Sequence, residues 1–247
     1  MLGTENPTQI DINFFPHLYR LSLLKDSAYH ELLWAPSNIE NYPHINAFLE
    51  AIVARPEFQG DVLATKRIYH EFVRRARAHT ADTKFQLYLP YPSEVDNTTE
   101  TIYILEATTP KPTVNTKVPR LYGHLLCPFV EMARMALAAR NVEYQRCEVD
   151  LGKKTPWHLA INGGLVPILE LQDGTLINES KILVDFAEDA YPESGYSILP
   201  EDPVVRAKMR LAFPLIDGFN QAYYPIYLNL KKGPATEDQY AKLREKL

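Results

Sequence analysis

The stretch PRLYGHLLCPFVEMARMALAARN, residues 119–141, decides the fold of this chain. Its first part is typical of a strand, and from Pro128 onward the apolar residues recur at helical spacing. Proline suits the first position of a helix, because the N–H that it lacks would have had no partner there. The stretch therefore predicts a strand that ends before Cys127 and a helix that begins directly after it.

Strands and helices continue to alternate beyond this stretch. VEYQRCEVD (142–150), LVPILELQ (165–172) and DGTLIN (173–178) are typical of strands, LGKKTPWHLAI (151–161) contains a turn, and helical spacing returns over 179–192. A βαβ unit followed by ββα predicts the α/β class with a small mixed sheet.

Residues 9–80 are helical in pattern. Thr8 can cap the first helix, and Asp11 can answer it three positions later. A second helix is expected within 42–58, where Pro56 ends it, and a third over roughly 64–78.

Prolines and two short β-like runs mark the segment that follows. KFQLYLPY (84–91) and TIYILEA (101–107) flank a polar stretch, which predicts a linker that could form a hairpin. Beyond Asp202 the sequence predicts one long helix, and TEDQYAKLREKL (236–247) opens another.

Composition excludes several classes of protein. The chain has 247 residues, of which 46% are hydrophobic, so it can bury one large core or two modest ones. A net charge of −5 with scattered Lys and Arg argues against a nucleic-acid partner. The first residues, MLGTENPTQI, lack the basic and apolar regions typical of a signal sequence, and no apolar run approaches the ~20 residues that span a bilayer. We therefore expect a cytoplasmic protein with no membrane partner.

The two cysteines, Cys127 and Cys147, are too few for a disulfide scaffold or a Cys-rich zinc site. Cys127 is expected at a helix N-terminus, where thiols can have pKa values well below the ~8.5 of free cysteine. We interpret it as a nucleophilic thiolate; the alternative is a small buried core residue. Because position 130 is Val, a redox cycle needs a second thiol from a small molecule. Cys147, within a strand, is interpreted as structural.

Two further features point to a site near this thiol. Pro167 stands at the entry to a strand, where a cis proline leaves the preceding backbone free to pair with an extended peptide-like ligand; the alternative is an ordinary strand-start proline. Asn178-Glu179-Ser180 opens a helix with Ser180 as the expected N-cap, and the exposed N–H groups predict a carboxylate site. Taken alone, that feature is only a cap.

Residues 117–202, which include RLYGHLLCPFVEMARMALAARN, LVPILEL and DGTLINESKILVDFAEDAYP, resemble the thioredoxin-fold domain of the omega-like glutathione S-transferases. The resemblance implies that Cys127 forms a mixed disulfide with glutathione. It also implies a set of glutathione-binding residues: Phe129 lining the site, Lys154 near the glycine end, Val166 beside cis Pro167 at the cysteinyl unit, and Glu179 with Ser180 at the γ-glutamyl end. The loop Asn162-Gly163-Gly164 is one residue shorter than the usual one, which leaves the role of Leu165 open.

The first 80 residues resemble the later helices of a glutathione-transferase helical domain, which ordinarily follow the thioredoxin half. The resemblance thus implies an α/β thioredoxin-like domain plus an all-α helical domain, the glutathione S-transferase fold, with its segment order permuted. The expected parts are 1–80 as later helices, 81–116 as a linker, 117–200 as the glutathione-binding domain and 201–247 as the first helices. Two explanations stay open: a piece of a tandem two-module thiol-dependent reductase, or a circularly permuted single module.

The resemblance implies a glutathione-dependent thiol transferase or reductase of the dehydroascorbate reductase type, with glutathione as co-substrate and no metal. The second substrate is a small electrophile or disulfide, and a homodimer is one possible assembly. Four aromatic residues offer a surface for that substrate, although core packing also explains them: Phe219, Tyr223, Tyr224 and Tyr227. The alternative functions are a noncatalytic interaction module and the conjugation of glutathione to electrophiles.

Overall fold

The computed structural model of the protein describes residues 4–27, 29–60, 62, 65–66 and 101–247. The chain divides into two compact units. One unit joins Met1–His79 to Ile198–Leu247, and the other is Thr80–Ser197. The β-like run KFQLYLPY and most of the helix predicted over 64–78 lie outside the described residues.

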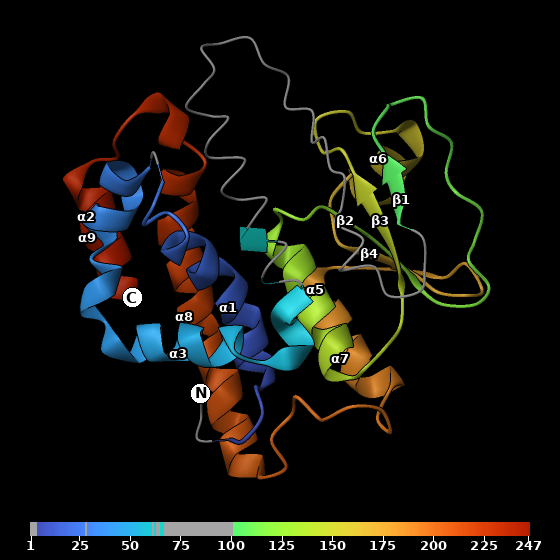
Figure 1. Ribbon diagram of the computed structural model, residues 1–247, viewed down its shortest axis with the longest axis horizontal. Helices are drawn as coiled ribbons and strands as arrows, with labels where there is room; N and C mark the ends of the chain where they lie inside the picture. Colours follow the sequence, from blue (N-terminus) through green and yellow to red (C-terminus); the bar gives the residue numbers. More distant parts are fainter. Residues whose placement is uncertain (1–3, 28, 61, 63–64, 67–100) are drawn as a thin grey trace. The chain divides into compact units, whose positions relative to one another are not determined.

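Among the described residues of the second unit, a five-stranded mixed sheet forms the centre (Figure 1). Its strands lie in the order β1-β3-β2-β4-β5. Strands β1 and β2 both run parallel to β3, whereas β4 is antiparallel to β2 and β5 is antiparallel to β4. The strand bounds are β1 Ile102–Ile104, β2 Arg120–Gly123, β3 Gln145–Val149, β4 Ile168–Glu170 and β5 Leu176–Asn178.

Three helices cover the sheet: α5 Pro128–Ala139, α6 Pro156–Asn162 and α7 Ser180–Ala190. Successive side chains of a strand point to opposite faces. Cys147 faces the apolar cluster to which Trp157 of α6 belongs. Its neighbour Glu148 faces the other way and pairs with Arg134 of α5. Helix α7 packs beside α5 (Figure 1). The sheet therefore separates α6 from the pair α5 and α7.

The predicted βαβ and ββα parts are present from β2 to α7, so the thioredoxin-like α/β class is confirmed. Between them lies helix α6, where the sequence analysis expected only a turn. Strand β1 was not predicted as part of this sheet. It comes from the run TIYILEA, expected in the linker, and pairs Ile102 with Cys147 and Ile104 with Val149 at the sheet edge. The run indicates a strand but not its partner, because β3 lies far along the sequence.

The other unit is built only of helices in the residues that the structure describes. Its first segment contains α1 Gln9–Ser22, a π-helical turn His30–Trp34, α2 Ala35–Ser37, a 3₁₀ turn Ile39–Asn41, α3 Pro43–Val53 and a 3₁₀ turn Pro56–Phe58. Its second segment contains α8 Pro203–Tyr227, a 3₁₀ turn Leu230–Lys232 and α9 Glu237–Lys246. Thr8 is the N-cap of α1, and its N–H donates to Asp11 Oδ2 at 2.8 Å, as the sequence predicts.

The two distant segments pack into one helical body. Phe14 of α1 meets Phe219 of α8 edge to face, with ring centroids 5.3 Å apart. Nearby, His17 Nδ1 lies 2.9 Å from the hydroxyl of Tyr224. The Tyr240 hydroxyl of α9 donates to the carbonyl of Leu32 at 2.6 Å. The chain thus combines an all-α unit with a thioredoxin-like unit, which is the predicted fold class. Within the described residues, no helix is long and apolar enough to cross a membrane.

Candidate functional site

The strand register gathers the predicted site residues at one end of the sheet. Tyr122 pairs with Ile168, and Ile168 pairs with Asn178. Both pairs are antiparallel, so the start of β4 and the end of β5 lie at the carboxyl end of β2. The segments that lead to Cys127, Pro167 and Glu179 therefore meet there.

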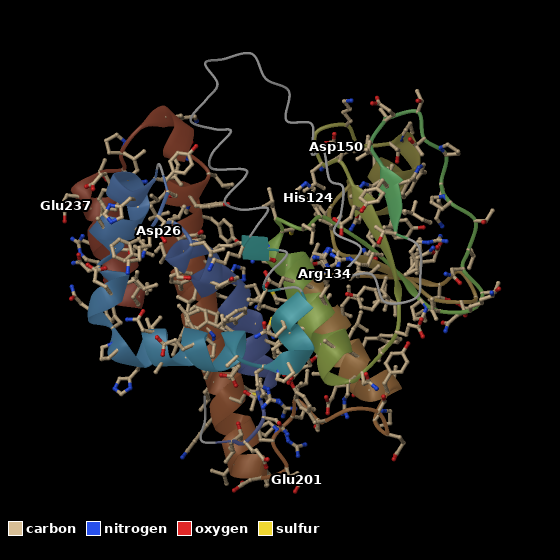
Figure 2. The ribbon with its side chains drawn as sticks, viewed as in Figure 1. Asp26, His124, Arg134, Asp150, Glu201 and Glu237 are labelled. Atoms are coloured by element: carbon tan, nitrogen blue, oxygen red, sulfur yellow. The ribbon has the colours of Figure 1, made fainter. Side chains whose placement is uncertain are left out.

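The carboxyl end of β3 lies at the same end, because β3 runs parallel to β2 and pairs Glu148 with Gly123. Figure 2 shows His124 and Asp150 beyond these two strand ends, with Arg134 farther along α5. Lys154 follows Asp150 in the loop that leads to α6. The fold thus brings the loop of Lys154 to the edge from which α5 begins.

Cys127 is the N-cap residue of α5, and Pro128 is the first helical residue. The predicted start of the helix is confirmed. The Cys127 N–H donates to the carbonyl of His124 at 2.9 Å, and its own carbonyl accepts the N–H of Glu131 at 3.2 Å. The residue is partly exposed and forms no disulfide. Its side chain therefore leaves the chain at the positive end of the helix dipole.

Helix α5 is held closely against the sheet. A Cβ at Gly123 would lie 2.5 Å from Val130 Cγ1, so only glycine permits this approach of β2 and α5. Arg134 Nη2 donates to Glu148 Oε1 at 2.7 Å inside the unit. Burial alone would raise the pKa of Glu148, but the guanidinium groups of Arg134 and Arg146 hold it below its usual value. These contacts fix the helix that carries Cys127.

The segment before β4 contains the cis peptide bond between Val166 and Pro167. Val166 is half-buried and Pro167 is buried. In the described part of the chain, neither the N–H nor the carbonyl of Val166 has a hydrogen-bond partner. These two groups are available to an extended ligand, which is the arrangement that the sequence analysis expected for a peptide-like molecule.

Lys154 lies against the loop that leads to Val166. A Cβ added to Gly164 would meet Lys154 Cδ at 2.6 Å, so the stem of the lysine passes directly over this glycine. Gly163 and Gly164 both have left-handed backbones, with φ of 73° and 70°. Glycine adopts this conformation without a steric penalty. The lysine and the Val166 loop therefore form one contiguous surface.

Ser180 is not the N-cap of α7, and this prediction is wrong by one residue. The helix begins at Ser180, and Glu179 occupies the cap position with φ 74°. The left-handed turn at Glu179 brings Ser180 into the first helical turn instead of before it. Glu179 is exposed and Ser180 is half-buried at the sheet edge described above.

Phe129, the second residue of α5, is 37% exposed and lies one residue beyond Pro128. Tyr122, by contrast, is fully buried, and burial raises its pKa. Its hydroxyl donates a hydrogen bond to Glu170 Oε2 at 3.0 Å, so Tyr122 is a core residue as the sequence predicts. Cys147 is also fully buried, and burial raises the pKa of its thiol to about 12.

The four aromatic residues predicted for a second substrate pack on one another in the helical unit. Tyr223 stacks on Phe219 and on Tyr227, with ring centroids 5.3 and 5.2 Å apart. Phe219 and Tyr223 are buried, whereas Tyr224 and Tyr227 are partly exposed. Within the described residues, no group of three or more His, Cys, Asp or Glu side chains is placed to hold a metal ion.

The similarity of this chain to known proteins includes the unit that contains this site. A family profile described as "Glutathione S-transferase, N-terminal domain" matches residues 121–195. Glutathione S-transferase omega-1 of Sus scrofa is 36% identical over 97 residues, which are 39% of this chain and 39% of that protein. "Probable glutathione S-transferase BZ2" of Zea mays is 40% identical over 106 residues, or 40% of this chain and 45% of that protein. The chain thus matches less than half the length of these two relatives.

One solved structure with similarity to this chain is glutathione transferase Omega 3C from Trametes versicolor. It is 31% identical, its TM-score is 0.43, and the match covers 53% of this chain and 59% of that one.

Proposed function

Since residues 121–195 are an omega-like glutathione S-transferase N-terminal domain, we propose that the chain is a glutathione-dependent thiol transferase or reductase with Cys127 as its nucleophile. The observation that carries the proposal is the position of Cys127 as the partly exposed N-cap residue of α5. A thiolate is favoured at such a position by the helix dipole. A cysteine there suits thiol transfer, in which the protein sulfur itself attacks, better than activation of the glutathione sulfur.

The proposed reaction has two exchange steps. The Cys127 thiolate attacks the glutathione sulfur of a glutathionyl mixed disulfide, the substrate S–S bond breaks, and the substrate thiolate leaves and takes a proton. Cys127 is then disulfide-bonded to glutathione. A second glutathione, as thiolate, attacks the sulfur of the glutathione bound to Cys127. This step releases oxidised glutathione and the Cys127 thiolate. An external thiol serves in this step because the residue three positions after Cys127 is Val130.

Glutathione would lie extended beside β4. Its cysteinyl unit would pair with the free N–H and carbonyl of Val166, next to Pro167. We assign the other predicted residues to the rest of the tripeptide: Lys154 to the glycine carboxylate, Glu179 and Ser180 to the γ-glutamyl end, and Phe129 to the wall beside the sulfur. The gathering of their segments at one sheet edge supports this assignment.

The finer features of the proposal concern the setting of the reaction. The second substrate is a small electrophile or a disulfide. The cycle consumes reduced glutathione, so it fits a reducing compartment such as the cytoplasm. A homodimer is the proposed assembly, which sedimentation of the purified chain would test.

The order of the segments is the remaining part of the proposal. We assign residues 1–80 to the later helices of a helical domain and 201–247 to its first helices. Between them lie the segment 81–116, from which β1 joins the sheet, and the domain 117–200. The packing of α1 against α8 supports one helical body made from both. Intact-mass analysis of the natural protein would distinguish a permuted module from a piece of a tandem chain.

Two assays on the purified protein test the reaction. One uses a glutathione mixed-disulfide substrate, and the other uses glutathione with a chlorinated aromatic electrophile. We expect turnover of the mixed disulfide alone. Turnover of the electrophile alone would replace the proposal by conjugation, and turnover of neither would support an interaction module.

A further inference from the structure

Helix α6 carries a buried histidine that contacts the loop leading to Val166. His158 is 1% exposed and lies in the first turn of α6, where its N–H donates to Oγ1 of the N-cap residue Thr155 at 3.3 Å. Its Nε2 atom lies 3.0 Å from the carbonyl oxygen of Leu165. A carbonyl oxygen can only accept a hydrogen bond, so Nε2 carries a proton and donates it.

The environment favours the neutral ring. Burial lowers the pKa of His158, and the nearby Lys154 cation acts in the same direction; together they outweigh the hydrogen bond to Leu165, which acts to raise it. A neutral imidazole has one N–H, and the bond to Leu165 assigns that N–H to Nε2. The ring is therefore a fixed single donor aimed at one backbone oxygen.

The Leu165 backbone is held from both sides by residues of α6. Its N–H donates to Asn162 Oδ1 at 3.1 Å, while its carbonyl accepts from His158. The Leu165 side chain is 59% exposed, so apolar packing does not fix the loop. The two preceding residues, Gly163 and Gly164, add little stiffness of their own. These two hydrogen bonds therefore set the orientation of the Leu165 backbone.

Planarity of the peptide bond passes this orientation to the next residue. The carbonyl of Leu165 and the N–H of Val166 belong to one trans peptide unit, in which they point in opposite directions. A donor that holds the carbonyl toward α6 therefore directs the Val166 N–H away from α6.

We propose that His158 is a positioning residue of the glutathione site, which orients the Leu165–Val166 peptide so that the Val166 N–H meets the bound tripeptide. This inference rests on the proposed function. His158 acts on the ligand only through the backbone, so its loss weakens glutathione binding without altering the reactivity of Cys127.

Three substitutions distinguish the effect of the hydrogen-bond donor of His158 from the effect of its ring. His158→Phe keeps a flat ring and removes the donor. In His158→Gln the amide nitrogen stands near the place of Nε2, whereas in His158→Asn it stands near that of Nδ1. We expect calorimetry to show a glutathione Kd raised about 10-fold by the Phe and Asn variants and within about 2-fold of wild type for Gln, because an unsatisfied buried carbonyl is costly.

The kinetic readout distinguishes positioning from a general loss of structure. With the mixed-disulfide substrate, whose glutathionyl half occupies the Val166 site, KM for this substrate should rise in the Phe and Asn variants while kcat at saturation changes less than about 2-fold. His17→Phe is the matched control, because His17 is buried in the helical unit. It should lower the melting temperature and leave the glutathione Kd unchanged. Equal Kd values for wild type, His158→Phe and His158→Asn would overturn the inference.

An NMR measurement decides the inference independently of the proposed function. In ¹⁵N,¹³C-labelled protein without glutathione, the Val166 amide and the Leu165 carbonyl resonances should shift in His158→Asn and stay near wild type in His158→Gln. Unmoved resonances in the Asn variant would overturn the orientation of this peptide by His158. If wild type binds no glutathione, the proposed function fails, whereas these resonances still test the orientation. If the Phe variant does not fold, the Asn and Gln variants give the same comparison.

Discussion

The N-terminus of α5 and the middle of β3 each hold one of the two cysteines, and their surroundings are opposite. Cys127 is partly exposed at a helix start, with Pro128 next to it. Cys147 is fully buried between Tyr122 and the apolar residues of α6, and burial raises its thiol pKa to about 12. Both residues are cysteines, so the difference comes from their positions in the fold. A thiol at a helix N-terminus is accessible to reagents, whereas a thiol inside a buried strand is not.

The largest expected difference is in alkylation. At pH 8 a thiol with a pKa of about 12 is ionised in only about one part in 10⁴, and burial further blocks access to Cys147. We expect iodoacetamide to modify Cys127 of the native protein below pH 8 about 10⁴-fold faster than Cys147. Peptide mapping by mass spectrometry measures both rates. Unfolding in urea is the control, because it should make the two rates similar; equal rates in the native protein would contradict the comparison.

Substitution of the exposed sulfur tests its role in the reaction. We expect Cys127→Ser to lower turnover of a glutathione mixed disulfide by about 10³-fold or more, because a hydroxyl does not replace the attacking thiolate. Glutathione affinity should change by less than about 2-fold, as calorimetry would show, because the proposed binding groups belong to other residues. Unchanged turnover in this variant would refute the assignment of Cys127.

Glu148 connects the two regions, since it follows Cys147 in β3 and pairs with Arg134 of α5. Removing one partner of a buried ion pair is strongly destabilising, so Glu148→Gln should lower the free energy of unfolding by about 3 kcal/mol. Urea titration measures this loss. Lys246→Gln is the control, because its ion pair with Glu245 is exposed and should contribute less than about 1 kcal/mol.

The same pair predicts an effect of pH. The pKa of Glu148 is lowered from 4.5 in the folded protein, so the unfolded chain binds this proton first as the pH falls. The stability from the pair is thus complete above about pH 4.5 and is lost as the pH falls toward the folded pKa. Glu148→Gln should lose less stability than wild type over that range. A wild-type curve parallel to that of the variant would contradict this prediction.

The smallest expected effect belongs to the buried sulfur. Cys147→Ala removes one buried atom from the cluster with Tyr122 and Trp157 and should cost about 1–2 kcal/mol. Turnover should stay at the wild-type level, because this buried residue takes no part in the proposed exchange steps. A loss of turnover without a loss of stability would instead indicate that Cys147 takes part in the reaction.

The local signals around Cys127 were sufficient to predict the start of α5 and, apart from helix α6, the order of elements from β2 to α7. Signals that depend on residues distant in sequence were not. TIYILEA became β1 only through its pairing with β3, and the left-handed turn at Glu179 moved the start of α7 by one residue. His158 has no sequence motif, because its meaning comes from the carbonyl that the folded loop places beside it.

The helical unit is discontinuous, since α1 from the start of the chain packs on α8 from near its end. During synthesis, α1 leaves the ribosome long before its partner exists, whereas every strand of the sheet is made in between. The thioredoxin-like unit can then complete its fold first, while the apolar side chains of Phe14 and its neighbours remain exposed until α8 is made. We therefore expect chaperones to bind the segment of α1 until α8 has been made.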